Sequence, residues 1–152
     1  SLPKAVGYGH DLAARESMLL ASCMAGMAFS SAGLGLCHAM AHQPGAALHI
    51  PHGLANAMLL PTVMEFNRMV CRDRFSQIGR ALRTKKSDDR DAINAVSELI
   101  AEVGINKRLA DVGATTGHYG AWAQAAQEDI CLRSNPRTAS LEQIVGLYAA
   151  AQ

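Results

Sequence analysis

The sequence predicts an all-α domain, and three observations support this fold class. Apolar residues recur at intervals of three and four along most of the chain, which places them on one face of a helix. No segment alternates apolar and polar residues in the way that is typical of a strand. Alanine, leucine, methionine and glycine are abundant whereas aromatic residues make up 5% of the chain, a composition that favours closely packed helices over a β-sandwich.

The size and charge of the chain limit the classes of partner. Its 152 residues form one ordinary domain, which can bury about 68–70% of the surface of the unfolded chain. The 14 basic and 13 acidic residues leave a formal net charge of +1, so we expect neither a nucleic-acid nor a membrane partner. The 4 cysteines show no CxxC pair and no framework spacing, which predicts a reduced, cytoplasmic setting. No basic and then apolar leader is present, so we expect no signal peptide.

The chain is expected to begin with a loop and one long helix. Residues 1–10 contain proline and glycine without periodicity and predict the loop. Asp11 can cap a helix over residues 11–30, in which apolar and small side chains share one stripe. Residues 18–37 are uncharged and long enough to span a bilayer. Because serines and glycines interrupt this run, we expect a helix buried inside the protein instead of a membrane span.

Two shorter helices are expected next. The second helix covers residues 36–42, and Pro44 with Gly45 ends it, because proline cannot continue a helical hydrogen-bond pattern. Residues 46–51 then form a connector. His52 lies just before a third helix, which runs to about residue 67 and is kinked at Pro61.

Charged residues return from residue 68, and four more helices are expected. They cover residues 68–83, 87–103 and 117–132, and the last begins after residue 140. The first of them is expected to turn four apolar residues inward: Val70, Phe75, Ile78 and Leu82. Ser87 begins its helix with acidic residues in the first turn, where they favour the helix dipole. Ser140 and Gln143 predict a capping box.

Four of the six histidines lie within one uncharged tract. They are His38, His42, His49 and His52, and no Asp, Glu, Lys or Arg occurs between Glu16 and Glu65. A buried polar group without a partner costs about 1–3 kcal/mol, so several imidazoles in an apolar tract indicate a common partner such as a metal ion. The alternative is that each histidine bonds a nearby backbone group, and this is the role we expect for His49.

The spacing of these histidines allows them to converge. His38 and His42 are four residues apart and therefore project from one face of a helix. The Pro-Gly pair after them lets the chain fold back, which can bring His52 near that face. Neutral imidazoles suit Zn²⁺, Fe²⁺ and similar ions. Spacing alone leaves metal binding and local hydrogen bonding both open.

Several well-defined catalytic and nucleotide-binding motifs are absent from the sequence. The run HAMAH lacks the glutamate of HExxH, because residue 39 is alanine. Gly33 and Gly35 do not form GxGxxG, since residue 38 is histidine. The chain contains no GxSxG elbow and no P-loop. These observations argue against a metalloprotease of that type, a serine hydrolase and a phosphate-binding loop.

Residues 33–67 strongly resemble the iron-containing (group III) alcohol dehydrogenases. The pattern of that family is roughly G-L-G-x-x-H-x-M-A-H-x-x-G-x(6)-P-H-G-x-A-N-A-x-L-L-P-x-V-M-x-F-N, and the chain meets it almost position for position. LPKAV near the start, LADVGA around Asp111 and the tail over residues 126–148 also match. The resemblance therefore covers essentially the whole chain.

The resemblance implies a larger enzyme. Its members combine an N-terminal dinucleotide-binding α/β domain with a C-terminal helical domain, and the active site lies between the two. Residues 1–152 look like a single all-helical, metal-binding domain, the C-terminal part of such a protein. The resemblance implies a homo-oligomer that interconverts small alcohols and aldehydes with NAD or NADP and a divalent metal. Fe²⁺ is the expected ion, with Zn²⁺ or Ni²⁺ as alternatives.

The resemblance also implies roles for particular residues. The family binds its metal with an aspartate, a histidine four residues later and two further histidines, and the last two match His38 and His52. His42 matches a histidine that is not a ligand but lies between metal and nicotinamide, where it can transfer a proton. Phe29, and more weakly Cys131, match positions that line the substrate pocket.

The chain departs from the family in one important respect. It contains no D-x-x-x-H motif, since Arg15 follows Asp11 by four residues and Thr115 follows Asp111. The glycine-rich cofactor loop is missing as well, so the chain carries half a metal site and is expected to be inactive alone. Two other functions remain open: a relative of the glycerol dehydrogenase or dehydroquinate synthase kind, and a stand-alone, non-catalytic helical module or degenerate paralogue.

Overall fold

The computed structural model describes residues 1–82, 84 and 88–152, and these residues form helices and loops with no strand. The helices are α1 (Leu2–Gly7), α2 (Leu12–Ala32), α3 (Leu36–Leu48), α4 (His52–Ala81), α5 (Asp89–Glu102), α6 (Thr116–Glu128) and α7 (Leu141–Ala150), with two short 3₁₀ helices, η1 (Ala110–Val112) and η2 (Ile130–Ser134). The predicted all-α class is confirmed.

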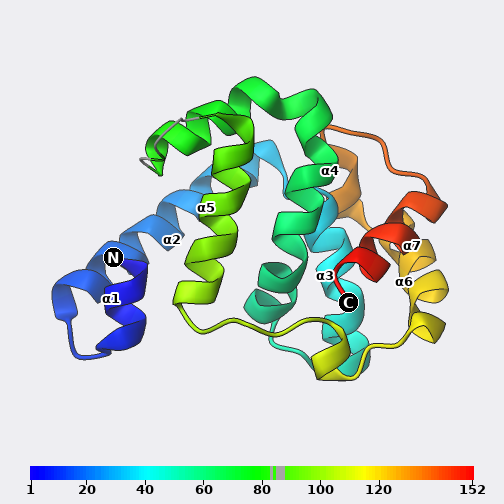
Figure 1. Ribbon diagram of the computed structural model, residues 1–152, viewed down its shortest axis with the longest axis horizontal. Coiled ribbons are helices and arrows are strands. Elements are labelled where there is room, and N and C mark those ends of the chain that lie inside the picture. The colour runs from blue at the N-terminus through cyan, green and yellow to red at the C-terminus, as the bar shows by residue number, and fades with distance from the viewer. Residues whose placement is uncertain (83, 85–87) are drawn as a thin grey trace.

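Helix α3 lies at the centre of the main body. It packs against α4 on one side and against α6 and η2 on the other, while α5 lies along α4 (Figure 1). Apolar residues occupy most positions of α3 itself, which is typical of a helix that other helices enclose. Its buried side chains are Leu36, Cys37, Ala39, Met40, Ala41 and Pro44. The histidines of this helix therefore sit on a rigid, packed element.

Helix α3 continues through Pro44, although the sequence predicted that it would end there. Proline has no N–H for the carbonyl of Met40, four residues earlier, and this loss normally breaks a helix. In the structure the hydroxyl of Tyr148 donates a hydrogen bond to that carbonyl at 2.8 Å. Both Pro44 and Tyr148 are fully buried. A side chain from the last helix thus replaces the missing bond, and the chain reverses only at residues 49–51.

Helix α4 is longer than the sequence predicted. Its 30 residues join the two helices expected over residues 52–67 and 68–83. The backbone departs from helical geometry at Cys71 (φ −125°, ψ 18°), whereas the kink was predicted at Pro61. Of the four residues expected to face inward here, only Phe75 is buried: Val70, Ile78 and Leu82 are 54%, 39% and 40% exposed. Helix α4 packs against α5, yet these three side chains remain partly exposed.

Several helix ends agree with expectation. Asp11 caps α2 by accepting a bond from Ala14 N at 2.9 Å. Ser140 and Gln143 form the predicted capping box. Ser87, predicted to begin a helix, lies outside the described residues, and the N-cap of α5 is Asp88. The helix expected over residues 117–132 stops at Glu128 and gives way to η2.

The first two helices project from the body (Figure 1). Residues 1–10 contain a short helix where a loop was predicted, because proline at the first turn is compatible with a helix start. Helix α2 was expected to be buried, yet Ala14 is its only buried residue. The prediction of burial was wrong for this chain, since apolar character does not say what covers a helix.

No single helix in the described part of the chain is both long and apolar enough to span a membrane. Helices α2 and α3 reach that length and hydropathy only together, and they are bent by 110° at the turn between them.

The turn between α2 and α3 is fixed by Asn135. Its Oδ1 accepts bonds from Leu36 N at 3.1 Å and from Asn67 Nδ2 at 3.0 Å, and its Nδ2 donates to Asn67 Oδ1 at 2.9 Å. Gly35 (φ 93°) allows the chain to approach Asn135 closely. Arg137 donates to Phe66 O at 2.6 Å and lies over the Phe66 ring. One amide thus joins the start of α3, the middle of α4 and the segment after η2.

Candidate functional site

Three of the four clustered histidines converge. His38 and His42 lie on α3 and His52 is the first residue of α4. The ring centroids of His38 and His52 are 5.2 Å apart, those of His42 and His52 are 5.5 Å apart, and those of His38 and His42 are 6.3 Å apart. His49 lies at the reversal between the helices in the left-handed conformation (φ 54°) and is exposed. The reversal, not a helix end at Pro44, brings His52 beside α3.

The pKa of His38 is lowered by its surroundings. Burial lowers its pKa below the usual value, and the neighbouring His52 and His42 lower it further, against a smaller opposing effect of Asp129. A lowered pKa favours the neutral imidazole, whose free nitrogen lone pair is the form that binds metal ions. The arrangement therefore makes His38 available as a ligand.

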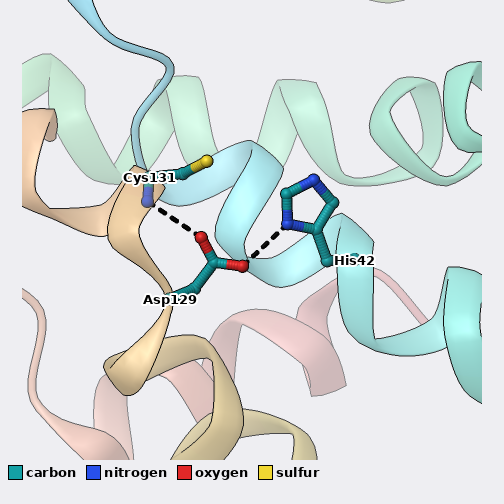
Figure 2. A group of neighbouring side chains, drawn as sticks. All are labelled: His42, Asp129 and Cys131. Atoms are coloured by element: carbon teal, nitrogen blue, oxygen red, sulfur yellow. Dashed lines mark hydrogen bonds and ion pairs between the residues drawn. The ribbon is translucent and has the colours of Figure 1, made fainter.

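His42 is held by a carboxylate. Its Nδ1 lies 2.7 Å from Oδ2 of Asp129, at the junction between α6 and η2 (Figure 2). Oδ1 of Asp129 accepts a bond from the backbone N–H of Cys131 at 2.8 Å. Burial alone raises the pKa of Asp129, but the hydrogen bonds from His42 and Cys131 outweigh it and lower the pKa. The carboxylate is therefore ionised at neutral pH.

His52 is held by an amide. Asn56, one turn later on α4, places Nδ2 at 3.2 Å from His52 Nε2 and at 3.0 Å from the backbone oxygen of His52. The thiol of Cys37 contacts Oδ1 of Asn56 at 3.5 Å. Burial raises the pKa of Cys37 to about 12, so this thiol stays protonated and can donate. A chain of contacts from α3 to α4 thus orients the His52 ring.

The donor set fits part of a metal site. His38 and His52 offer two imidazole nitrogens from different helices, fewer than the three protein ligands of a typical catalytic zinc site. A second group, His42, Asp129 and Cys131, has ligand atoms within 4.8 Å of one another in the described chain. There the Nδ1 and Oδ2 atoms already bond each other, and burial raises the pKa of Cys131, which keeps its thiol protonated. That group fits a positioned histidine better than a metal site.

The structure places the other predicted site residues less closely. Cys131 lies beside Asp129 and His42 (Figure 2). Phe29 is 46% exposed on α2, and no hydrogen bond or ring contact joins it to the histidines within the ranges described. His118 lies outside the cluster, where it completes the capping box of α6 and stacks on Trp122.

Sequence reasoning missed two residues of this site, Asp129 and Asn56. Asn56 belongs to the same histidine-rich tract, four residues after His52, and this spacing was a usable signal. Asp129 is 87 positions from His42, and no local pattern relates the two residues.

Comparison with known proteins identifies the family. The whole chain, residues 1–152, matches the family described as "Fe-containing alcohol dehydrogenase family, C-terminal". This chain belongs to that family, and the resemblance found in its sequence is confirmed.

Individual relatives are longer than this chain. The "Probable alcohol dehydrogenase EutG" of Escherichia coli (strain K12) is 96% identical over 152 residues, which are 100% of this chain and 38% of that protein. The "Lactaldehyde reductase" of the same strain is 44% identical over 147 residues, 93% of this chain and 38% of that protein. The chain thus spans well under half the length of these relatives.

Solved structures share the fold. A crystal structure of 1,3-propanediol oxidoreductase matches with a TM-score of 0.95 at 37% identity, covering 99% of this chain and 41% of that one. The alcohol dehydrogenase from Oenococcus oeni matches with a TM-score of 0.95 at 39% identity, covering 100% and 41%. The predicted likeness to the C-terminal helical domain of this fold is therefore confirmed.

Proposed function

We propose that this chain forms part of the catalytic site of a metal- and NAD(P)-dependent alcohol dehydrogenase, which interconverts alcohols and aldehydes. The observation that carries the proposal is the convergence of His38, His42 and His52 in a chain of the iron-containing family. Relatives named for lactaldehyde and 1,3-propanediol favour a small alcohol or aldehyde as substrate.

We assign the roles of the three histidines from the contacts that orient each imidazole. His38 and His52 would hold the metal, which we propose is Fe²⁺, with Zn²⁺ or Ni²⁺ as alternatives. When bound, the metal would supply Lewis-acid polarisation of an alcohol oxygen, and the nicotinamide would supply the hydride acceptor. His42 stands beside the pair and takes up the alcohol proton. Phe29 and Cys131 line the substrate pocket.

We propose further that the chain works with an N-terminal dinucleotide-binding domain, within a cytoplasmic homo-oligomer. Its 38% share of the length of its relatives supports a larger protein. The two-histidine donor set supports the same conclusion, because further ligands must come from elsewhere.

A chimera tests the function. This chain is joined to the N-terminal part of the E. coli protein that is 96% identical, and NAD- or NADP-linked oxidation of small alcohols is measured. We expect turnover that a chelator abolishes and Fe²⁺ restores, and no turnover from the chain alone. Turnover by the isolated chain would contradict the proposal, because it would show that this chain contains a complete catalytic site. An inactive, metal-loaded and folded chimera would favour the non-catalytic module.

A further inference from the structure

A carboxylate from a distant part of the chain holds one of the three converging histidines. Asp129 follows α6, whereas His42 lies 87 positions earlier on α3, and their side chains meet at 2.7 Å (Figure 2). Neither His38 nor His52 has a hydrogen-bonded carboxylate in the described ranges. The contact therefore distinguishes His42 from the two histidines proposed as ligands.

Asp129 accepts hydrogen bonds on both oxygens. Its Oδ1 accepts a hydrogen bond from the backbone N–H of Cys131 and thereby caps η2, which fixes the carboxylate in place. Its side chain is only 15% exposed, and its lowered pKa keeps the carboxylate ionised at neutral pH. An ionised carboxylate has no proton to donate. The proton between Oδ2 and Nδ1 therefore belongs to the imidazole.

We propose that Asp129 is a positioning residue, which holds His42 in the Nδ1–H tautomer and leaves Nε2 as its free acceptor nitrogen. Which nitrogen of a histidine reacts is set by the bond that the other nitrogen makes. Nε2 lies on the side of the ring away from Asp129 (Figure 2). No described residue donates a bond to it.

The consequence for catalysis rests on the proposed function. As the alcohol is oxidised, its O–H bond breaks and the proton forms an N–H bond with the lone pair of His42 Nε2. The electron pair of the C–H bond leaves as hydride to the nicotinamide cofactor. Asp129 keeps the proton on Nδ1 and faces the resulting imidazolium as its counter-charge, in the manner of the aspartate of a serine protease triad.

The tautomer can be read directly by NMR on the chain labelled with ¹⁵N-histidine. At alkaline pH, where imidazoles are neutral, each ring nitrogen reports whether it carries a proton. We expect Nδ1 of His42 to be protonated and Nε2 to be bare. A bare Nδ1 in the unaltered chain would overturn the proposal without any variant.

Two variants and a control connect the tautomer to Asp129. Asp129→Ala should abolish the preference for Nδ1–H, and Asp129→Asn, which can still cap η2, should reduce it. Glu128→Gln removes a neighbouring exposed carboxylate and should change nothing. Circular dichroism establishes that each variant is folded. An unchanged Nδ1–H signal in both folded Asp129 variants would refute the role of Asp129.

Titration with Zn²⁺ separates the proposal from its closest rival. If His42, Asp129 and Cys131 were a metal site, Zn²⁺ would displace the Nδ1 proton of His42, and this loss would overturn the proposal. We expect the proton to remain. The readout needs no turnover, so an inactive chimera with the Nδ1–H tautomer intact would count against the proposed dehydrogenase and not against the role of Asp129.

Discussion

Each of the three converging histidines has a different environment. His42 bonds a carboxylate through Nδ1, His52 contacts the amide of Asn56 through Nε2, and burial lowers the pKa of His38. A carboxylate partner strengthens a histidine as a base, whereas a neutral, desolvated imidazole is suited to bind a metal. The contacts therefore favour a division of roles in which only His42 handles protons.

Alanine variants in the active chimera test this division. His38→Ala should lower metal retention by at least about tenfold and abolish turnover, because it removes a ligand. His42→Ala should lower the rate and leave the metal content unchanged. Metal content is measured by elemental analysis after gel filtration. Equal metal loss in the two variants would contradict the assignment.

A stability measurement tests the bond between Asp129 and His42. Asp129→Asn should lower the free energy of unfolding by about 1–3 kcal/mol at neutral pH, because it removes a charge-assisted, largely buried bond. The folded-state pKa of Asp129 is lowered, so its contribution is complete above the ordinary aspartate value of about 3.9. It is lost as the pH falls through the folded-state value. Urea unfolding at several pH values measures the difference, and a deficit that persists in acid would contradict this account.

The sequence could indicate the histidines of the site but not the residue that orients His42. Helical spacing relates His38 to His42. His52 does return to their face, as expected, but the chain reverses at residues 49–51 and not at the Pro-Gly pair from which the return was predicted. Asp129 meets His42 only because α6 packs on α3 and ends beside it. Such a contact depends on the tertiary fold, and a single sequence carries no local pattern for it.

At the scale of helices, the clearest difference from expectation is α3. Proline in a helix interior costs about 3 kcal/mol, and this rule predicted an end at Pro44. The structure compensates with the hydroxyl of Tyr148, which bonds the carbonyl of Met40 from 108 positions away. The local rule is sound, but its outcome is decided by a side chain that the local sequence does not contain. The caps of Asp11 and Ser140 were predictable because both partners lie within one turn.

A double-mutant cycle tests this compensation. Tyr148→Phe should destabilise the chain by about 1–3 kcal/mol, because it leaves the buried Met40 carbonyl without a partner. In a Pro44→Ala background residue 44 regains an N–H for that carbonyl, so the same change should cost less. Denaturant unfolding of the four proteins measures the coupling. Equal costs in both backgrounds would show that the Tyr148 bond does not compensate for Pro44.

At the scale of the whole molecule, the projecting helix α2 is notable because its apolar side chains are not buried against the rest of the described chain. Five large apolar residues on it are more than half exposed: Leu12 (78%), Leu19 (74%), Leu20 (62%), Met24 (60%) and Met27 (71%). Exposed apolar patches of this kind are typical of surfaces that meet other polypeptide. The sequence pattern identified the helix and its apolar stripe, but a pattern cannot say whether the covering surface belongs to the same chain. The relatives are more than twice as long as this chain, so polypeptide that could cover α2 exists in them.

The isolated chain should therefore bind an apolar dye on α2. Leu19→Glu combined with Met27→Glu should remove most of the fluorescence of bound anilinonaphthalene sulfonate, because it places two charges within the exposed apolar face. Helicity by circular dichroism should be unchanged, since neither residue contributes to a buried core. The matched control, Ala121→Glu with Gln124→Glu, adds the same charge to exposed positions of α6 and should leave the fluorescence intact. An equal loss in both variants would mean that net charge, and not the α2 face, governs dye binding. In the chimera the unaltered chain should bind little dye, because the added polypeptide covers α2.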